Sequence, residues 1–376
     1  MSDYIDEDDM TMLFIVLLSS EAHRLETKAE DSRTLLRGSI VAQNESPWAH
    51  LYASKCDRAF IKYTGVNVAT FERLLLAFTP LYSMTTPYNR GGQYFRRLNI
   101  PRTSRTVFAA DGLALALRWC GSQCSHDMLV PFFGMLPTMI STYLPYCLSL
   151  LLIVLKNDRA AHIGFPSARE QQLLACMVVH KYPLLKGCIG AIDGLRLPVT
   201  DSADEMLQER YYNGWHSEHC TNNVLVWLAD GTIAAAGMNY WGTNHDSTTA
   251  LESGIYHSLT QHLTRGLYIA GDCAFPSINR KIRRVSKANE GGAQSPHELA
   301  WEKSLTALRQ CSEWGNNELC RVFPRLKTKW DINNSAFRQL GMMTIVHLHN
   351  LRTRLLGRNE IRSVFYTPFV EEFCEQ

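Results

Sequence analysis

The chain has 376 residues, of which 46% are apolar and 10% are aromatic. This composition is ample for one or two packed cores, and the length predicts two or three domains. The eleven cysteines form no regular framework and follow no secretory signal, which argues against a disulfide-bonded extracellular protein. Free thiols in a reducing compartment are expected.

The formal net charge of +2 hides an uneven distribution. Residues 1–31 hold nine acids and two bases, whereas residues 32–376 hold 36 bases and 27 acids. The sequence therefore predicts a basic body behind an acidic arm. Residues 321–362 hold nine bases and two acids, a surplus that suits a polyanionic partner. A solvated helix face would show the same surplus, so both interpretations stay open.

The first half of the chain is expected to be helical. Residues 1–50 are expected to form an acidic arm with one helix, at the apolar run 10–20, which follows acidic residues where a signal peptide would have basic ones. Residues 51–165 are expected to form an all-α domain in which three helices over 110–156 have the outline of a helix-turn-helix. The apolar run 147–155 is too short to span a bilayer, and no membrane contact is expected.

The pattern changes from about residue 185. Short apolar runs bounded by Gly, Asp and Asn predict the strands of a buried sheet at 187–193, 222–230, 232–240 and 267–272. One helix is expected after Asp246, because apolar residues recur there on a single helical face: Leu251, Ile255, Leu259 and Leu263.

The predicted fold class is therefore an all-α region followed by a mixed α/β domain. The α/β domain is placed at 180–335 with a basic insertion at about 277–303. A basic helical segment at 336–376 is expected to follow it.

Two aspartates mark a candidate site in the α/β region. Asp193 and Asp272 each end a predicted strand, so their carboxylates converge if the two strands are neighbours. Hard divalent cations such as Mg²⁺ prefer oxygen ligands, and a third acid would complete such a site. Asp246 and Glu313 are the candidates favoured by local context.

Each of these acids also has an ordinary structural interpretation. Asp193 precedes Gly194 and would suit a turn. Asp246 would suit a helix cap, a use compatible with metal binding. Glu313 would suit a surface ion pair with Arg309 one turn earlier. Cys120, Cys124 and His126 suggest zinc, but without a fourth ligand or CxxC spacing buried cysteines are favoured.

Five ordered blocks carry a family resemblance over about residues 180–330. They are AIDGLRLPV, YYNGWHSEHCTNNVLVWLADGTI, WGTNHDS, GDCAFP and SEWGNNELCRVFPRLK. In order and approximate spacing they resemble the Harbinger-type DDE transposases and their domesticated nuclease relatives. The resemblance implies an RNase H-like mixed sheet with flanking helices and a DDE triad that holds two metal ions, Mg²⁺ or Mn²⁺.

The resemblance also implies roles for individual residues. Asp193, Asp272 and Glu313 match the triad, and Asp246 matches a fourth acid often counted with the site. Two metal ions would activate a water or a 3′-hydroxyl for in-line displacement at a phosphodiester, without a covalent protein intermediate. The same site would thus both cut DNA and join transposon ends to target DNA.

The family further implies partners. These are DNA, a separate Myb-like protein that recognises the ends and aids nuclear import, and a second copy of the chain. Bases near the acids are candidates for phosphate contact: Arg196, Arg280, Lys281, Arg283, Arg284, Lys287, Arg325 and Lys327. The run at 280–287 would alternatively be a nuclear-import signal or a solvated loop.

Some residues depart from the family pattern. Leu195 and Arg196 stand where Thr and His are usual, and Trp241-Gly242-Thr243-Asn244 replaces Pro-Gly-Ser before the HDS block. No Lys or Arg occurs from Trp119 to Leu155, which favours a packing or docking role for the helix-turn-helix. A catalytically silent binding protein of the same ancestry, or a small-phosphoester hydrolase, therefore stays an alternative.

Overall fold

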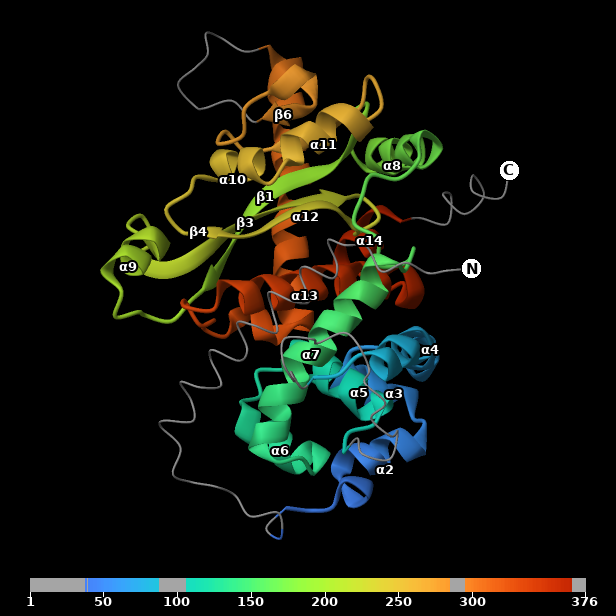
Figure 1. Ribbon diagram of the computed structural model, residues 1–376. Helices are drawn as coiled ribbons and strands as arrows, with labels where there is room; N and C mark the ends of the chain where they lie inside the picture. Colours follow the sequence, from blue (N-terminus) through green and yellow to red (C-terminus); the bar gives the residue numbers. More distant parts are fainter. Residues whose placement is uncertain (1–37, 39, 88–105, 285–294, 367–376) are drawn as a thin grey trace. The chain divides into compact units, whose positions relative to one another are not determined.

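The computed structural model describes residues 38, 40–87, 106–284 and 295–366 (Figure 1). The predicted helix at 10–20 and Lys287 of the basic insertion lie outside these residues. The chain divides into two compact units. The first comprises the described residues up to Arg159 with Val322–Thr328 and Asn333–His347, and the second comprises Ala160–Arg321, Lys329–Ile332 and the described residues from Leu348.

The first unit is helical throughout the part that the structure describes. Its elements are η2 (Gln43–Glu45), α2 (Pro47–Ser54), α3 (Asp57–Thr64), α4 (Val68–Met84), α5 (Ala109–Cys120), α6 (His126–Phe133), α7 (Pro137–Lys156), η5 (Pro324–Lys327) and the first part of α13 (Ser335–Leu356). Trp48 anchors an aromatic core, with ring centroids 5.6 Å from Phe71 and 6.0 Å from both Phe60 and Phe133. Its indole N–H donates to Asp111 Oδ1 at 2.9 Å.

The third helix of the predicted helix-turn-helix is a core helix. Residues 143–155 of α7 are buried without interruption, and the helix continues past Pro145, although proline usually ends or kinks a helix. The helix is also longer than the apolar run 147–155 suggested, and by length and composition it could cross a membrane. However, 78% of its most apolar 18-residue stretch is buried inside the protein. This burial leaves little of α7 to enter a DNA groove. The helix-turn-helix outline and its packing or docking role stay predictions.

The second unit contains a mixed sheet, as predicted. Its strands are β1 (Cys188–Pro198), β2 (Tyr212–Asn213), β3 (Glu218–Leu228), β4 (Ile233–Trp241), β5 (Tyr268–Gly271) and β6 (Ile282–Arg284). The order is β2-β3-β1-β5-β6, and β4 also pairs with β3. β1 is antiparallel to β3 and parallel to β5, and β5 is parallel to β6. Central β1 therefore lies between one antiparallel neighbour, β3, and one parallel neighbour, β5.

Two details of the sheet differ from the sequence-based expectation. β1 continues to Pro198, so Asp193 lies inside the strand, opposite Leu225 of β3, and does not end it. β6 was not predicted, because its three residues include two arginines and lie in the basic run. The pairing of β6 with β5 depends on backbone hydrogen bonds, which require no apolar pattern.

The helices of the second unit are α8 (Ala168–Lys181), α9 (Glu205–Tyr211), α10 (Asp246–Glu252), α11 (Ile255–His262), η4 (Ile278–Arg280), α12 (Pro296–Val322, its last residue in the first unit), the last part of α13, and α14 (Glu360–Phe365). The single helix expected after Asp246 is split into α10 and α11 at Gly254, whose φ of 75° is left-handed. Leu251 consequently leaves the predicted apolar face and is 66% exposed.

The flanking helices approach the sheet from both faces (Figure 1). On one face a Cβ at Gly237 of β4 would lie 2.6 Å from Ser253, between α10 and α11. On the other, a Cβ at Gly315 of α12 would lie 2.6 Å from the ring of Trp227 in β3. Missing side chains thus let helices from both faces approach β3 and β4 closely.

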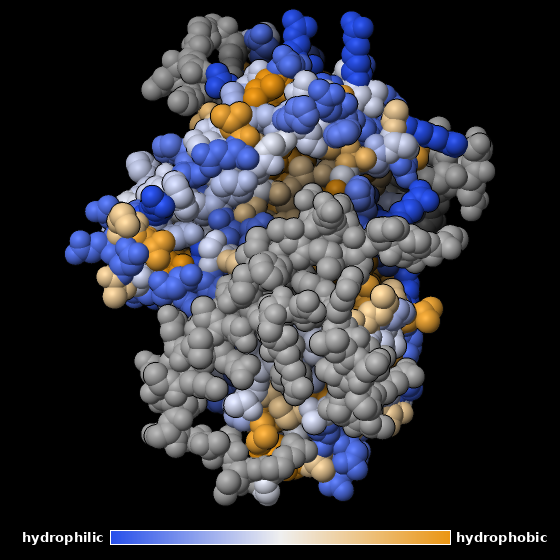
Figure 2. Space-filling model, viewed as in Figure 1, coloured by the Kyte–Doolittle hydropathy of each residue, from blue (hydrophilic) through white to orange (hydrophobic). Residues whose placement is uncertain are grey.

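Exposed apolar side chains gather at the end of the second unit where α9 lies. Figure 2 shows apolar residues among the polar ones over this end of the sheet. Four large side chains of α9, β2, the following turn and β4 are exposed: Met206, Tyr212, Trp215 and Trp241. A cluster of this kind is typical of a surface that contacts another molecule.

Candidate active site

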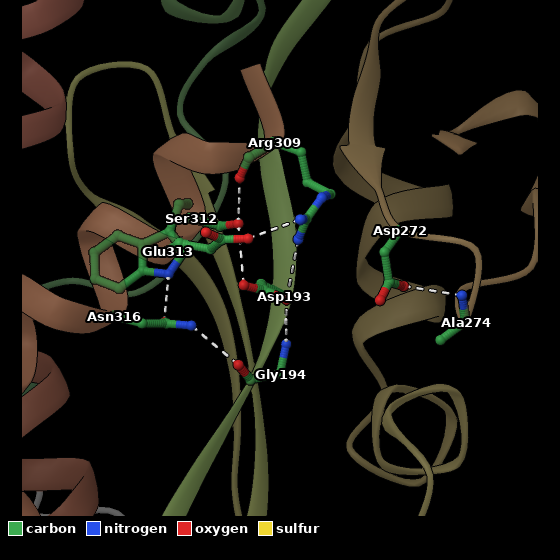
Figure 3. A network of polar contacts seen from close by, with 9 residues as sticks. Asp193, Gly194, Asp272, Ala274, Arg309, Ser312, Glu313 and Asn316 are labelled. Atoms are coloured by element: carbon green, nitrogen blue, oxygen red, sulfur yellow. Dashed lines mark hydrogen bonds and ion pairs between the residues drawn. The ribbon is translucent and has the colours of Figure 1, made fainter. Parts of the chain in front are cut away.

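Asp193 and Asp272 lie on neighbouring parallel strands. Ala191 of β1 is paired with Ala270 of β5, and each aspartate follows its alanine by two residues. β5 ends at Gly271, so Asp272 begins the loop, where its Oδ1 accepts a hydrogen bond from Ala274 N at 2.9 Å (Figure 3). The sheet thus brings the two acids to the same level on adjacent segments, as expected if the strands were neighbours.

Helix α12 is fixed to the sheet by Gly315 and Asn316. Gly315 lets the helix approach the indole of Trp227, whose Nε1 donates to Asn316 Oδ1 at 3.0 Å. Asn316 Nδ2 in turn donates to the carbonyl of Gly194 at 3.0 Å (Figure 3). These contacts join α12 to β3 and β1, and they hold the preceding helical turn, with Glu313, beside Asp193.

Arg309 lies between Asp193 and Glu313. Its Nη2 is 2.7 Å from Glu313 Oε1, and its Nη1 is 3.9 Å from Asp193 Oδ1 (Figure 3). The Ser312 hydroxyl, which donates to the Arg309 carbonyl at 2.7 Å, also lies 3.3 Å from Asp193 Oδ2. The ion pair between Glu313 and Arg309 is therefore confirmed, but the same guanidinium also faces an acid of another element.

Asp246 reaches β1 from α10. It is the first residue of that helix, and the N-cap position belongs to His245. A Cβ at Gly194 would lie 2.5 Å from Asp246 Oδ2, so the carboxylate rests against the residue after Asp193. Asn222 of β3 donates to Asp246 Oδ1 at 3.0 Å and fixes its orientation.

Gly194→Ala is expected to lower the free energy of unfolding by about 1–3 kcal/mol, because its methyl group would overlap the Asp246 carboxylate. Urea unfolding in a double-mutant cycle with Asp246→Ala checks the cause. In the Asp246→Ala background most of the loss should vanish, since the overlapping group is gone. An equal loss in both backgrounds would contradict the assignment.

The pKa values connect the four acids. Burial raises the pKa of Asp193 to about 6; Arg309 opposes this rise, whereas Asp272 and Glu313 add to it. Burial also raises the pKa of Asp246, the Asn222 hydrogen bond lowers it, and Asp272 raises it again. Four carboxylates from β1, α10, α12 and the loop after β5 therefore share one electrostatic region.

The donor set suits a hard divalent cation in kind, because every candidate ligand is a carboxylate. The ligands are not gathered for one: among the residues that the structure describes, no group of three or more His, Cys, Asp or Glu side chains is arranged to hold a metal ion. Arg309 provides the positive charge between Asp193 and Glu313. A metal ion would have to draw these acids together and displace the guanidinium.

One of three comparisons with known proteins finds a match, and it covers the region of the candidate site. Residues 192–350 match the family model of the DDE superfamily endonucleases. No curated protein and no solved structure matches the chain. The DDE match contains all four candidate acids, and it supports a DDE transposase-like family and a transposase or nuclease function for this region.

The predicted phosphate contacts differ in exposure and in their contacts within the protein. Arg196, which lies within the DDE match, and Arg280, Arg283, Arg284 and Lys327 are exposed. Lys281, in contrast, donates to the carbonyls of Leu263 and Thr264 at the end of α11.

Arg283 and Arg325 are also bound within their own units. The Arg283 guanidinium lies 4.2 Å from the ring centroid of Tyr268. Arg325 donates to the carbonyls of Trp119 and Cys124 within the first unit. Packing and carbonyl contacts thus occupy Lys281, Arg283 and Arg325.

The basic stretch at 321–362 has a similar explanation. Arg338 is 0% exposed. Arg352 is half-buried: burial lowers its pKa to about 10, and the nearby Glu318 opposes this fall. Arg354 donates to the carbonyls of Ala160 and His162, and Arg321 pairs with Glu360 at 2.6 Å. Part of this positive charge is satisfied within the protein, whereas Lys327, Lys329 and Arg358 are exposed. Contact of the stretch with a polyanion therefore stays a prediction.

Several residues around the acids were not foreseen. Ser312 and Asn316 lie in the SEWGNN block and Asn222 in the CTNN block. The signal was therefore present, but spacing alone does not show that Asn316 binds β1 or that Asn222 orients Asp246. Tyr256 was also missed: its buried hydroxyl has no hydrogen-bond partner among the residues that the structure describes. Burial, Asp246 and Asp272 raise its pKa to about 12.

Proposed function

We propose that this protein is a Harbinger-type DDE transposase or a nuclease derived from one. It hydrolyses DNA phosphodiester bonds and joins transposon ends to target DNA with two divalent cations, Mg²⁺ or Mn²⁺. The observation that carries the proposal is that Asp193 and Asp272 stand at matching positions on β1 and just after its parallel neighbour β5. Helix α12 places Glu313 beside Asp193.

The strand order supports an RNase H-like sheet. The first acid lies on the central strand β1, which is antiparallel to β3 on one side and parallel to β5 and β6 on the other. The second acid follows the parallel neighbour, and the third lies on the long helix after the last strand. This arrangement brings carboxylates from distant segments of the chain close to central β1.

Asp193, Asp272 and Glu313 would hold the cations, and Asp246 would assist. Bound cations would activate a water or a 3′-hydroxyl and stabilise the leaving oxygen of an in-line displacement. Asp193 must lose its proton to act as a ligand, so its pKa of about 6 favours metal binding above that pH. Exposed Arg196, three residues after Asp193 on β1, would contact a DNA phosphate.

The test is cleavage of labelled linear DNA carrying the element's own ends, with Mg²⁺ or Mn²⁺ and a Myb-like protein. Asp272→Asn and Glu313→Gln keep size and remove charge. Each should lower the cleavage rate by more than about 100-fold, since even the residues that only hydrogen-bond to metal ligands change activity by about 10–100-fold. Glu360→Gln is the control: it also removes a glutamate charge, but Glu360 pairs with Arg321, outside the candidate site.

Equal cleavage by all variants would contradict the site and indicate a contaminating nuclease. Intact DNA binding without cleavage by the wild type would favour a domesticated binding protein instead.

The proposed partners are DNA, a Myb-like protein that recognises the ends, and a second copy of the chain, acting in the nucleus. The burial of α7 and the lack of Lys or Arg from Trp119 to Leu155 support a separate end-recognition protein. Two ends must be brought together, which favours a homodimer. The exposed apolar side chains near α9 would suit contact with another protein.

A further inference from the structure

We propose that Arg309 is an internal counter-ion that competes with the divalent cation for Asp193 and Glu313, so that metal binding requires the guanidinium to leave. The inference rests on the proposed metal site and adds that Arg309 limits how readily a metal ion occupies it. Arg309 would set the metal concentration at which the acids become a working site.

The geometry of Arg309 carries the inference. Its two terminal nitrogens face two carboxylates, 2.7 Å from Glu313 Oε1 and 3.9 Å from Asp193 Oδ1. The Arg309 and Asp193 side chains are 24% and 16% exposed, so water screens this contact less than it would on an open surface. Glu313 is more exposed, at 48%.

An ordinary helix ion pair would not have this arrangement. A pair four residues apart on an exposed helix face needs only the helix, and its contribution to stability is small. Here the guanidinium also faces β1, and α12 is held against that strand by Asn316. Arg309 therefore neutralises acids from two elements at the place where a metal ion would join them.

Competition has a measurable consequence. The apparent affinity of a ligand is its intrinsic affinity multiplied by the fraction of protein in which the site is available. A state in which Arg309 occupies the acids therefore lowers the apparent metal affinity. Removing the guanidinium charge should tighten Mn²⁺ binding by roughly two- to fivefold, the range expected for one partly exposed ion pair.

The experiment is a Mn²⁺ titration of the full chain near pH 7.5, following free Mn²⁺ by electron paramagnetic resonance. The variants are Arg309→Gln, Arg309→Lys and Asp272→Asn. Arg309→Gln should bind more tightly and Arg309→Lys near the wild-type value, because lysine keeps the charge. Arg321→Gln is the matched control, since this arginine lies on the same helix and pairs with Glu360.

The outcomes separate the inference from the proposed function. Wild-type binding that is lost in Asp272→Asn, with no tightening in Arg309→Gln, would overturn the role of Arg309 and leave the metal site intact. No binding by either the wild type or Arg309→Gln would overturn both. Binding by Arg309→Gln alone would support the inference. If Arg309→Gln does not fold, Arg309→Met keeps the aliphatic stem and provides the same test.

Discussion

Asp193→Asn is expected to abolish metal-dependent DNA cleavage and, at the same time, to stabilise the metal-free protein at neutral pH. Burial and the neighbouring acids raise the pKa of Asp193 from 3.8 to about 6, so its charge is unfavourable in the folded state. Removing that charge should raise the free energy of unfolding by on the order of 1–3 kcal/mol at pH 7. The loss of a metal ligand should stop cleavage.

The pH dependence gives the sign of this effect. Because the folded pKa lies above the unfolded value, Asp193 contributes stability below about pH 4, and that stability is lost as the pH rises through about 6. Denaturant unfolding between pH 4 and pH 8 should show this decline in the wild type. In Asp193→Asn the decline should be smaller by the share that Asp193 contributes.

Two measurements check the cause. Asp201→Asn removes an aspartate whose side chain is 70% exposed, and it should not reproduce the stabilisation. Saturating Mg²⁺ should stabilise the wild type, by about 2.7 kcal/mol at a hundredfold excess over Kd, but not Asp193→Asn. A variant that is less stable at pH 7 and still cleaves would show that Asp193 lies outside the site.

Gly315→Ala is expected to displace the turn of α12 that carries Glu313. The added Cβ would lie 2.6 Å from Trp227 and 2.9 Å from Ile361, and both of these side chains are buried. Alanine favours the helix by about 1 kcal/mol over glycine, but overlap with a buried ring should exceed this gain. We expect a net loss of about 1–3 kcal/mol in unfolding free energy.

The larger effect should be on catalysis. A shift of about 1 Å at a reacting group can cost 100-fold in rate, so cleavage should fall by about that factor even where the variant is fully folded. Gly121→Ala is the control, because its nearest contact is an ordinary 3.4 Å to the Leu117 carbonyl oxygen. Unchanged cleavage by a stable Gly315→Ala protein would separate Glu313 from the reaction.

Local sequence patterns were sufficient to predict the main strands but not to predict where elements end. β1, β3, β4 and β5 are buried apolar runs, which is the pattern of strands covered on both faces. β1 was predicted too short because Gly194 after Asp193 indicates a turn, whereas here it makes room for Asp246. The break at Gly254 was missed because apolar residues keep their spacing across it.

By itself, the sequence determined the buried strands and which acids stand beside them, since both are written in short, contiguous blocks. Only the tertiary structure decided what surrounds those acids: Asp246 against Gly194, Asn316 on β1 and Arg309 between Asp193 and Glu313. It also decided that bases such as Arg338 and Arg325 are used inside the fold. The physical reason is that periodicity is local, whereas the partner of a buried charge is chosen by packing between segments far apart in the chain.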